Sequence, residues 1–236
     1  MLRNLPLFCS AILTSLTLVA CSTTSTLTPA QRSRIHRIGV TTSLVDTDVT
    51  AARVGITVFG NNNSLFSSSR LGLPEAVDKA IAGNLRGFNV VALSSAESHA
   101  LRAKLESIPD HGIFNMDEKR TATAKFVSEA AKDKNLDAVL VVRPGLIFVH
   151  DKAPVGHGYM VFKYLWRTNA IASLQLLLCE PKTGKLLADA GAISGKELQN
   201  LSSWESAMGG DNPEVKQALL ECSEKAANKG MSQLGF

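Results

Sequence analysis

The chain has 236 residues, of which 45% are hydrophobic, and a formal net charge of +4 at pH 7. This apolar content is typical of a folded globular domain and argues against a disordered chain. Basic and acidic residues are nearly balanced, at 25 and 21, and no basic stripe occurs, which argues against nucleic acid as a partner.

The first 20 residues have the three parts of an export signal. Arg3 supplies positive charge, residues 5–20 are mostly apolar, and small residues precede Cys21. The stretch 18–21 resembles the lipobox of bacterial lipoproteins, in which the signal is cut before a cysteine that carries lipid. The resemblance implies a membrane anchor at Cys21, and Ser22 in place of an aspartate implies the periplasmic face of the outer membrane. An ordinary export signal that ends near a cysteine is the alternative.

Residues 22–34 are rich in Ser and Thr and lack apolar periodicity, which predicts a flexible tether. Thirteen extended residues reach at most about 45 Å. The expected organisation is therefore a signal peptide at 1–20, a lipidated cysteine and tether at 21–34, and one periplasmic domain at 35–236.

In this domain, helices and strands are expected first in alternation and then as a run of strands before a last helix. The clearest helix spans 73–86, where apolar residues recur every four positions at Leu73, Val77, Ile81 and Leu85. A turn is expected at 61–63. The expected strands are 35–45, 53–59, 88–93, 136–142, 146–150, 158–166, 170–180 and 185–193, and the other helices are 95–106, 117–133 and 213–234.

This order predicts an α/β (α+β) fold. It consists of a single mixed sheet with helices largely on one face, a C-terminal strand meander and a closing helix. No second apolar run approaches the roughly 20 residues that a membrane helix needs.

Four segments of this order, at 38–40, 87–91, 135–141 and 176–187, follow a known pattern of strand ends and turns. Together they resemble the periplasmic α/β domain shared by the TolB amino-terminal domain, the curli-secretion lipoproteins and the lipoprotein activators of penicillin-binding proteins. The resemblance implies a non-catalytic module that docks other proteins in the cell envelope.

The sequence offers little catalytic chemistry, since it has no Gly-x-Ser-x-Gly, phosphate-binding glycine loop, Cys-x-x-Cys or His-Glu-x-x-His motif. His150, Asp151 and His157 could supply metal ligands, and the pair Asp110–His111 could act as a general base. Solvated loops are the better interpretation of both stretches, because turn-forming and charged residues surround them. We therefore expect no enzymatic activity, no metal and no cofactor.

The four cysteines reduce to two in the mature domain, because Cys9 lies in the signal and Cys21 is the expected lipid site. In an oxidising compartment, Cys179 and Cys222 could form a disulfide, and two buried thiols are the alternative.

The stretch 158–166 holds both tyrosines of the chain and one of its two tryptophans. Strand geometry places four of its side chains on one face. They are Met160, Phe162, Tyr164 and Trp166. This face is either core, in a strand covered on both sides, or an exposed surface that binds a partner.

We therefore expect a membrane-anchored, non-catalytic assembly or docking factor with envelope proteins as partners. A lipoprotein that binds a small molecule or glycan is the alternative.

Overall fold

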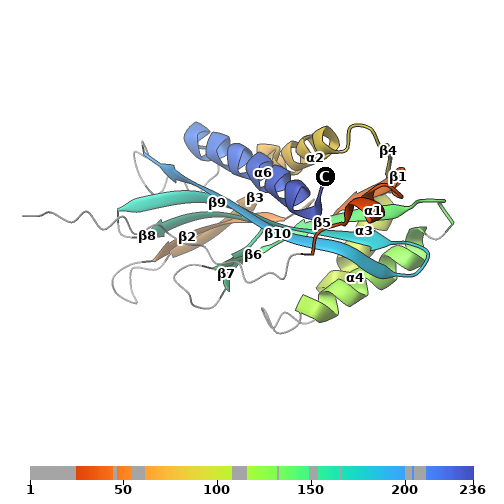
Figure 1. The fold of residues 1–236 in the computed structure, drawn as a ribbon. Coiled ribbons are helices and arrows are strands. Elements are labelled where there is room, and N and C mark those ends of the chain that lie inside the picture. Colours follow the sequence, from red (N-terminus) through yellow and green to blue (C-terminus); the bar gives the residue numbers. More distant parts are fainter. Residues whose placement is uncertain are drawn as a thin grey trace, which may run out of the picture.

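Two long strands, β9 (Arg167–Glu180) and β10 (Lys185–Leu198), form an antiparallel hairpin that runs through the molecule (Figure 1). The computed structural model describes residues 25–44, 47–54, 62–107, 116–131, 133–148, 154–164, 166–199, 204 and 211–236. Every residue from Ala170 to Cys179 is buried, so β9 is the central strand of the sheet.

The edge of β9 opposite β10 is shared by two groups of strands. The first half of β9 pairs with β8 (Tyr159–Tyr164), and the second half pairs with β5 (Ala138–Pro144), both antiparallel. Beyond β5 lie β1 (Arg37–Thr42) and β4 (Asn89–Ala92), both parallel to their neighbours. Beyond β8 lie β2 (Asp48–Val54), which is parallel to it, and β3 (Asn62–Ser67), which is antiparallel to β2.

The two groups meet at Ser173 in β9. The amide of Gly145 donates to the carbonyl of Ser173 at 2.8 Å, and the amide of Ser173 donates to the carbonyl of Gly158 at 2.7 Å. A Cβ at Gly145 would lie 2.5 Å from Ser173 Oγ, and Gly158 has a φ of +67°, so both positions favour glycine. Between them the chain forms the small hairpin of β6 (Leu146–Phe148) and β7 (Pro154–His157).

Helices cover both faces of the sheet (Figure 1). On one face lie α2 (Leu73–Asn84) and the closing helix α6 (Pro213–Leu234), and on the other lie α3 (Ser95–Glu106) and α4 (Met116–Ala131). Alternate side chains of β5 therefore enter different clusters: Leu140 packs on the α2 and α6 side, whereas Val139 and Val141 pack on the α3 and α4 side.

The predicted helix at 73–86 is confirmed as α2. Leu73, Val77, Ile81 and Leu85 are each at most 1% exposed. Gly87, with a φ of +102°, follows the last turn. A repeat of four apolar positions therefore identified both the helix and its buried face.

The α/β class, the mixed sheet and the closing helix are confirmed. Two details differ from expectation. Helices lie on both faces because α3 and α4 bury their own cluster against β5 and β9. The strand β2 begins at Asp48, five residues before the predicted start at residue 53, and β3 begins at Asn62, where a turn was predicted. Residues 55–61 lie outside the described part of the chain.

Residues 25–34, which were predicted to belong to a flexible tether, are attached to the domain in the structure. Ser25 and Asp189 exchange backbone hydrogen bonds of 3.0 and 3.1 Å. Leu27 is 6% exposed and its amide donates to the carbonyl of Leu234. Thr28 then caps the short helix α1 (Pro29–Arg32) with a capping box. Cys21 lies outside the described residues. Within the described part, no helix combines the length and apolar character required to cross a membrane.

Candidate functional site

The aromatic strand β8 separates into a buried part and an exposed part. Tyr159 and Val161 enter the core beneath α2 and α6. Met160 and Phe162 face the other way and pack with Ile147 of β6. They are 0% and 5% exposed, so this half of the candidate surface is core.

Tyr164 and Trp166 lie at the end of β8 and at the start of the turn into β9, and we call these two residues the aromatic tip. Tyr164 is 38% exposed and Trp166 is 80% exposed. Leu65, on the edge strand β3 of the same half of the sheet, is 66% exposed. Leu65 lies level with Met160 in the strand register, whereas Tyr164 and Trp166 lie at one end of the sheet, where exposed aromatic side chains are suited to contact another protein.

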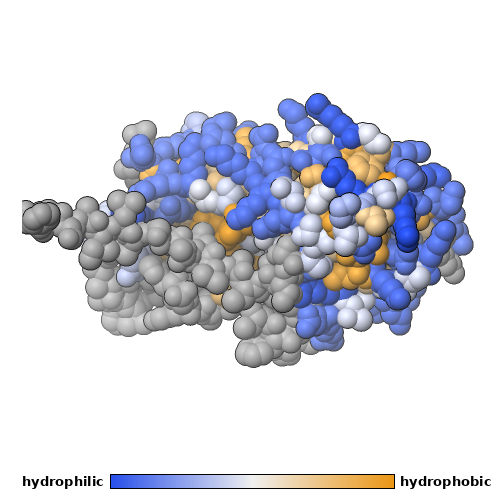
Figure 2. Space-filling view, in the orientation of Figure 1, coloured by the Kyte–Doolittle hydropathy of each residue, from blue (hydrophilic) through white to orange (hydrophobic). Residues whose placement is uncertain are grey.

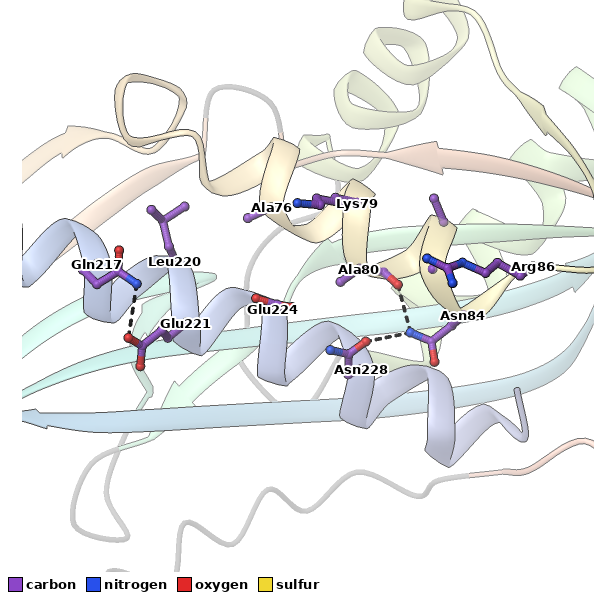
Figure 3. A pocket seen from close by; sticks show the side chains of 12 residues that line it. Ala76, Lys79, Ala80, Asn84, Arg86, Gln217, Leu220, Glu221, Glu224 and Asn228 are labelled. Atoms are coloured by element: carbon purple, nitrogen blue, oxygen red, sulfur yellow. Dashed lines mark hydrogen bonds between the residues drawn. The ribbon is translucent and has the colours of Figure 1, made fainter.

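A groove of about 790 Å³ runs between α2 and α6 on the opposite face of the sheet (Figure 3). Asn84 on α2 bridges the two helices, since its Nδ2 donates to Asn228 Oδ1 at 2.7 Å. Basic and acidic side chains face each other across the groove. The lining residues are Ala76, Lys79, Ala80, Ala82, Gly83, Asn84, Arg86, Gln217, Leu220, Glu221, Glu224 and Asn228.

Glu221 on α6 already has two hydrogen-bond partners. Lys196 Nζ donates to Glu221 at 2.8 Å, and this hydrogen bond, followed by one from Gln217, lowers the pKa of Glu221. Figure 2 shows that the surface over α6 is mostly hydrophilic. The groove is therefore a polar, open feature rather than an apolar pocket for a buried ligand.

The two cysteines of the domain are free thiols, and the disulfide interpretation is wrong. Cys179 on β9 packs in the cluster beneath α4, whereas Cys222 on α6 packs in the cluster on the other face of the sheet. Cys222 Sγ donates to the carbonyl of Ala170 at 3.4 Å. The sheet itself separates the two sulfur atoms, so the alternative of two buried thiols holds.

Of the candidate residues in the two polar loops, only His157 lies within the described part of the chain. His157 ends β7, whereas His150, Asp151 and the Asp110–His111 pair lie outside the described residues. No group of three or more His, Cys, Asp or Glu side chains in the described part could hold a metal ion.

One polar cluster was not predicted from the sequence. Arg143, at the end of β5, is 6% exposed, and its Nε and Nη2 donate to Gln175 Oε1 on β9 at 2.9 and 2.6 Å. Burial, and then the nearby charge of Arg120, lowers the pKa of Arg143 to about 10. The available signal was an arginine at the end of an apolar strand, but its partner depended on the pairing of β5 with β9.

Neither a protein-family model nor a curated protein matches the sequence. A comparison with solved structures finds distant similarities, and some of these proteins are bacterial lipoproteins. Lipoprotein GNA1162 from Neisseria meningitidis is 14% identical, covers 71% of this chain and 88% of its own, and has a TM-score of 0.34. PelC from Paraburkholderia phytofirmans, solved as a dodecamer, is 11% identical, with coverages of 89% and 94% and a TM-score of 0.39. The hypothetical protein CT253 from Chlamydia trachomatis is 6% identical, with coverages of 85% and 95% and a TM-score of 0.41.

These identities and TM-scores do not place the chain in a family. The resemblance of its strand ends to the TolB, curli and penicillin-binding-protein activator domains stays a prediction.

Proposed function

We propose that this chain is a lipid-anchored lipoprotein on the periplasmic face of the outer membrane, where it acts without catalysis as an assembly or docking factor. The aromatic tip, Tyr164 and Trp166, would contact its protein partner. The observation that carries the proposal is the 80% exposure of Trp166 at the end of a strand whose preceding residues, Met160 and Phe162, are buried.

The exposure of Trp166 is informative because a strand that is paired on both sides supports this residue. Tryptophan and tyrosine contribute strongly to protein interfaces because they bury a large area at a small cost in conformational entropy. The tip continues directly from β8, which is paired on both sides by β2 and β9. Trp166 is therefore presented by an ordered sheet, and little further ordering of the backbone is needed on binding.

The anchor is supported by the sequence of residues 1–21. Several acyl chains, each contributing about 0.8 kcal/mol per buried CH₂, would hold the protein stably at a membrane. Replacement of Cys21 by Ala should prevent acylation and the lipoprotein cut. Mass spectrometry of the mature N-terminus tests this directly, and an unmodified peptide that begins at another residue would contradict the anchor.

Docking is tested by a photo-crosslinking amino acid placed at Trp166 in intact envelopes. We expect one discrete crosslinked protein. The same amino acid at Lys182, an exposed residue of the β9–β10 turn, is the matched control and should not capture that protein. Trp166→Ala should weaken co-purification of the captured protein by ~2 kcal/mol or more without lowering stability. The same crosslinks at both positions, or unchanged co-purification, would contradict docking through the tip.

A second candidate function, the binding of a polar small molecule or glycan, is favoured by the α2–α6 groove. Its lining includes amide and charged side chains, which hydrogen-bond to polar solutes. A side chain at Gly83 would project into open space, since no atom lies within 4 Å of its Cβ position. Gly83→Trp should therefore block the groove while the domain stays folded. A bound polar solute that survives this change would exclude the groove as its site.

A further inference from the structure

Arginines from two separate segments gather at the corner of the sheet where β1 and β4 begin (Figure 1). One segment leads from α1 into β1, and the other connects α2 to β4. We call these residues the basic corner, and they are Arg32, Arg34, Arg37 and Arg86. The pairing of Arg37 with Asn89 brings the two segments together. Arg32 lies over the ring of Phe236, 5.9 Å from its centre, and that ring contacts Phe88.

The positive charge of the basic corner is not neutralised by side chains in the described part of the chain. There, none of its guanidinium groups pairs with a carboxylate, whereas Arg70 and Arg167 elsewhere on the surface do. Asp137 lies beside the start of β1, but its carboxylate accepts the backbone amides of His36 and Arg37, both at 2.8 Å. The corner therefore presents an excess of positive charge to solvent.

The basic corner lies close to the point where a lipid anchor would join the domain. Ser25 is held on β10 by its backbone hydrogen bonds with Asp189. From Ser25 the chain reaches Arg32 through three residues and one turn of helix, which together span at most about 17 Å. Only residues 22–24 separate Ser25 from Cys21. A membrane that holds Cys21 is therefore within reach of a domain that turns this corner toward it.

Anionic phospholipid headgroups have the chemistry that fits this surface. Arginine binds phosphate through paired, charge-assisted hydrogen bonds, and basic residues beside a membrane anchor add to the attraction of an anionic bilayer. Val90 on the edge strand β4 is 42% exposed and adds apolar surface next to the arginines, as suits the boundary between headgroups and acyl chains.

We infer that the basic corner rests on the anionic headgroups of the membrane that holds the lipid anchor, and that it thereby orients the domain. This inference rests on the anchor of the proposed function. The start of β1 lies level with Cys179 near the end of β9, whereas Trp166 precedes the first residue of β9. The orientation would therefore turn the aromatic tip away from the membrane.

The test uses the lipidated protein, purified from envelopes in detergent and reconstituted into phosphatidylcholine vesicles with or without phosphatidylglycerol. An environment-sensitive dye is attached to Val90→Cys. Leu65→Cys, with the same dye, is the matched control, because Leu65 is 66% exposed on the other edge strand, β3. We expect the Val90 dye to shift to shorter wavelength only in the anionic vesicles, and the Leu65 dye to stay unchanged. In 1 M salt, where the screening length is about 3 Å, the shift should disappear.

Arginine variants test the source of this signal. Arg34→Gln combined with Arg86→Gln should lower the ratio of headgroup-bound to free corners about 30-fold, from about fivefold for each basic residue removed. Arg70→Gln removes an exposed arginine that pairs with Asp211, and it should leave the ratio unchanged. A Val90 signal that is equal in neutral and anionic vesicles, or that survives the double substitution, would overturn the basic corner.

Flotation with the neutral vesicles reports on the anchor separately. Protein that floats with them but gives no anionic shift at Val90 keeps the anchor and loses only the basic corner. Protein that does not float with them carries no anchor, which would overturn both the anchor of the proposed function and this inference.

Discussion

Arg120 on α4 donates to the buried carboxylate of Asp189 on β10 at 2.5 Å, and the same guanidinium reaches Asp117 at 2.9 Å. The two carboxylates differ in exposure, since the side chain of Asp117 is 94% exposed and that of Asp189 is 6% exposed. The same arginine therefore makes a buried ion pair and a surface ion pair, and these can be compared within one protein.

Asp189→Asn should lower the free energy of unfolding by about 3–5 kcal/mol, because it removes the buried counter-charge of Arg120 and leaves only the exposed Asp117. Asp117→Asn is the matched control and should cost about 0–1 kcal/mol, since its ion pair is exposed to solvent. Urea denaturation of both variants measures the difference. Equal losses would contradict the assignment of Asp189 as the partner that stabilises the contact between α4 and β10.

Phe162→Ala should lower the free energy of unfolding by about 3–5 kcal/mol, because the side chain is 5% exposed and its removal leaves a cavity beside Met160. Trp166→Ala should change it by less than about 0.5 kcal/mol, as expected for a surface position. Thermal and urea unfolding give both values. If Trp166→Ala were as destabilising as Phe162→Ala, the tip would be part of the core.

Both cysteine thiols should resist alkylation in the native protein. Burial raises the pKa of Cys179 to about 12 and that of Cys222 to about 11, from an ordinary 9.0. Both are therefore protonated at pH 8, and the thiol is a poor nucleophile. Iodoacetamide should label both only in guanidinium, without a reductant, as read by mass spectrometry of their peptides. Labelling that requires prior reduction would show a disulfide.

The same pKa shifts predict a dependence of stability on pH. The unfolded thiols lose their protons near pH 9, whereas the folded thiols keep theirs, so the folded state binds more protons and stability falls as pH rises above 9. Each thiol contributes a slope of about 1.4 kcal/mol per pH unit in this range. Cys179→Ala should make the fall between pH 9 and 11 less steep than in the native protein.

Gly83→Ala should stabilise the protein by about 0.5–1 kcal/mol, because Gly83 is an exposed residue inside α2 and a Cβ there meets no atom within 4 Å. Gly230 is the matched control inside α6. A Cβ at Gly230 would lie 2.6 Å from Leu176 Cδ1, so Gly230→Ala should lose about 1–3 kcal/mol through overpacking. Unfolding midpoints that move in the same direction would contradict this packing of α6 on β9.

Local sequence patterns correctly predicted the helices and strands whose apolar residues repeat regularly or form an unbroken run. The apolar repeat from Leu73 to Leu85 identified α2, and the unbroken apolar run at 138–142 identified the strand β5. In contrast, β2 contains the sequence Thr50–Arg53, which shows little alternation, and β3 begins with two asparagines. Their strand conformation comes from pairing with each other and with β8, which a local pattern does not contain.

The candidate site could be predicted only in part, because contacts between distant residues are not contained in a local pattern. Alternation along β8 correctly separated the faces of Met160 and Tyr159. It did not show how far along β8 the neighbouring core residues cover that face. This boundary lies between Phe162, which is buried, and Trp166, which is exposed. The contact between Arg143 and Gln175 joins residues 32 positions apart and depends on the register of two strands. The division of the cysteines between the two faces likewise follows from the sheet.

The pairing of Ser25 with β10 changes how far the domain could move from a membrane. Three residues separate Ser25 from Cys21, and the four steps from one Cα to the next span at most about 14 Å when fully extended. A lipid on Cys21 would thus keep the middle of β10 close to the headgroups, and the domain could pivot about that point but could not travel across the periplasm. A partner bound at Trp166 would meet the domain about 33 Å along β9 from Leu177, the residue that pairs with Asp189.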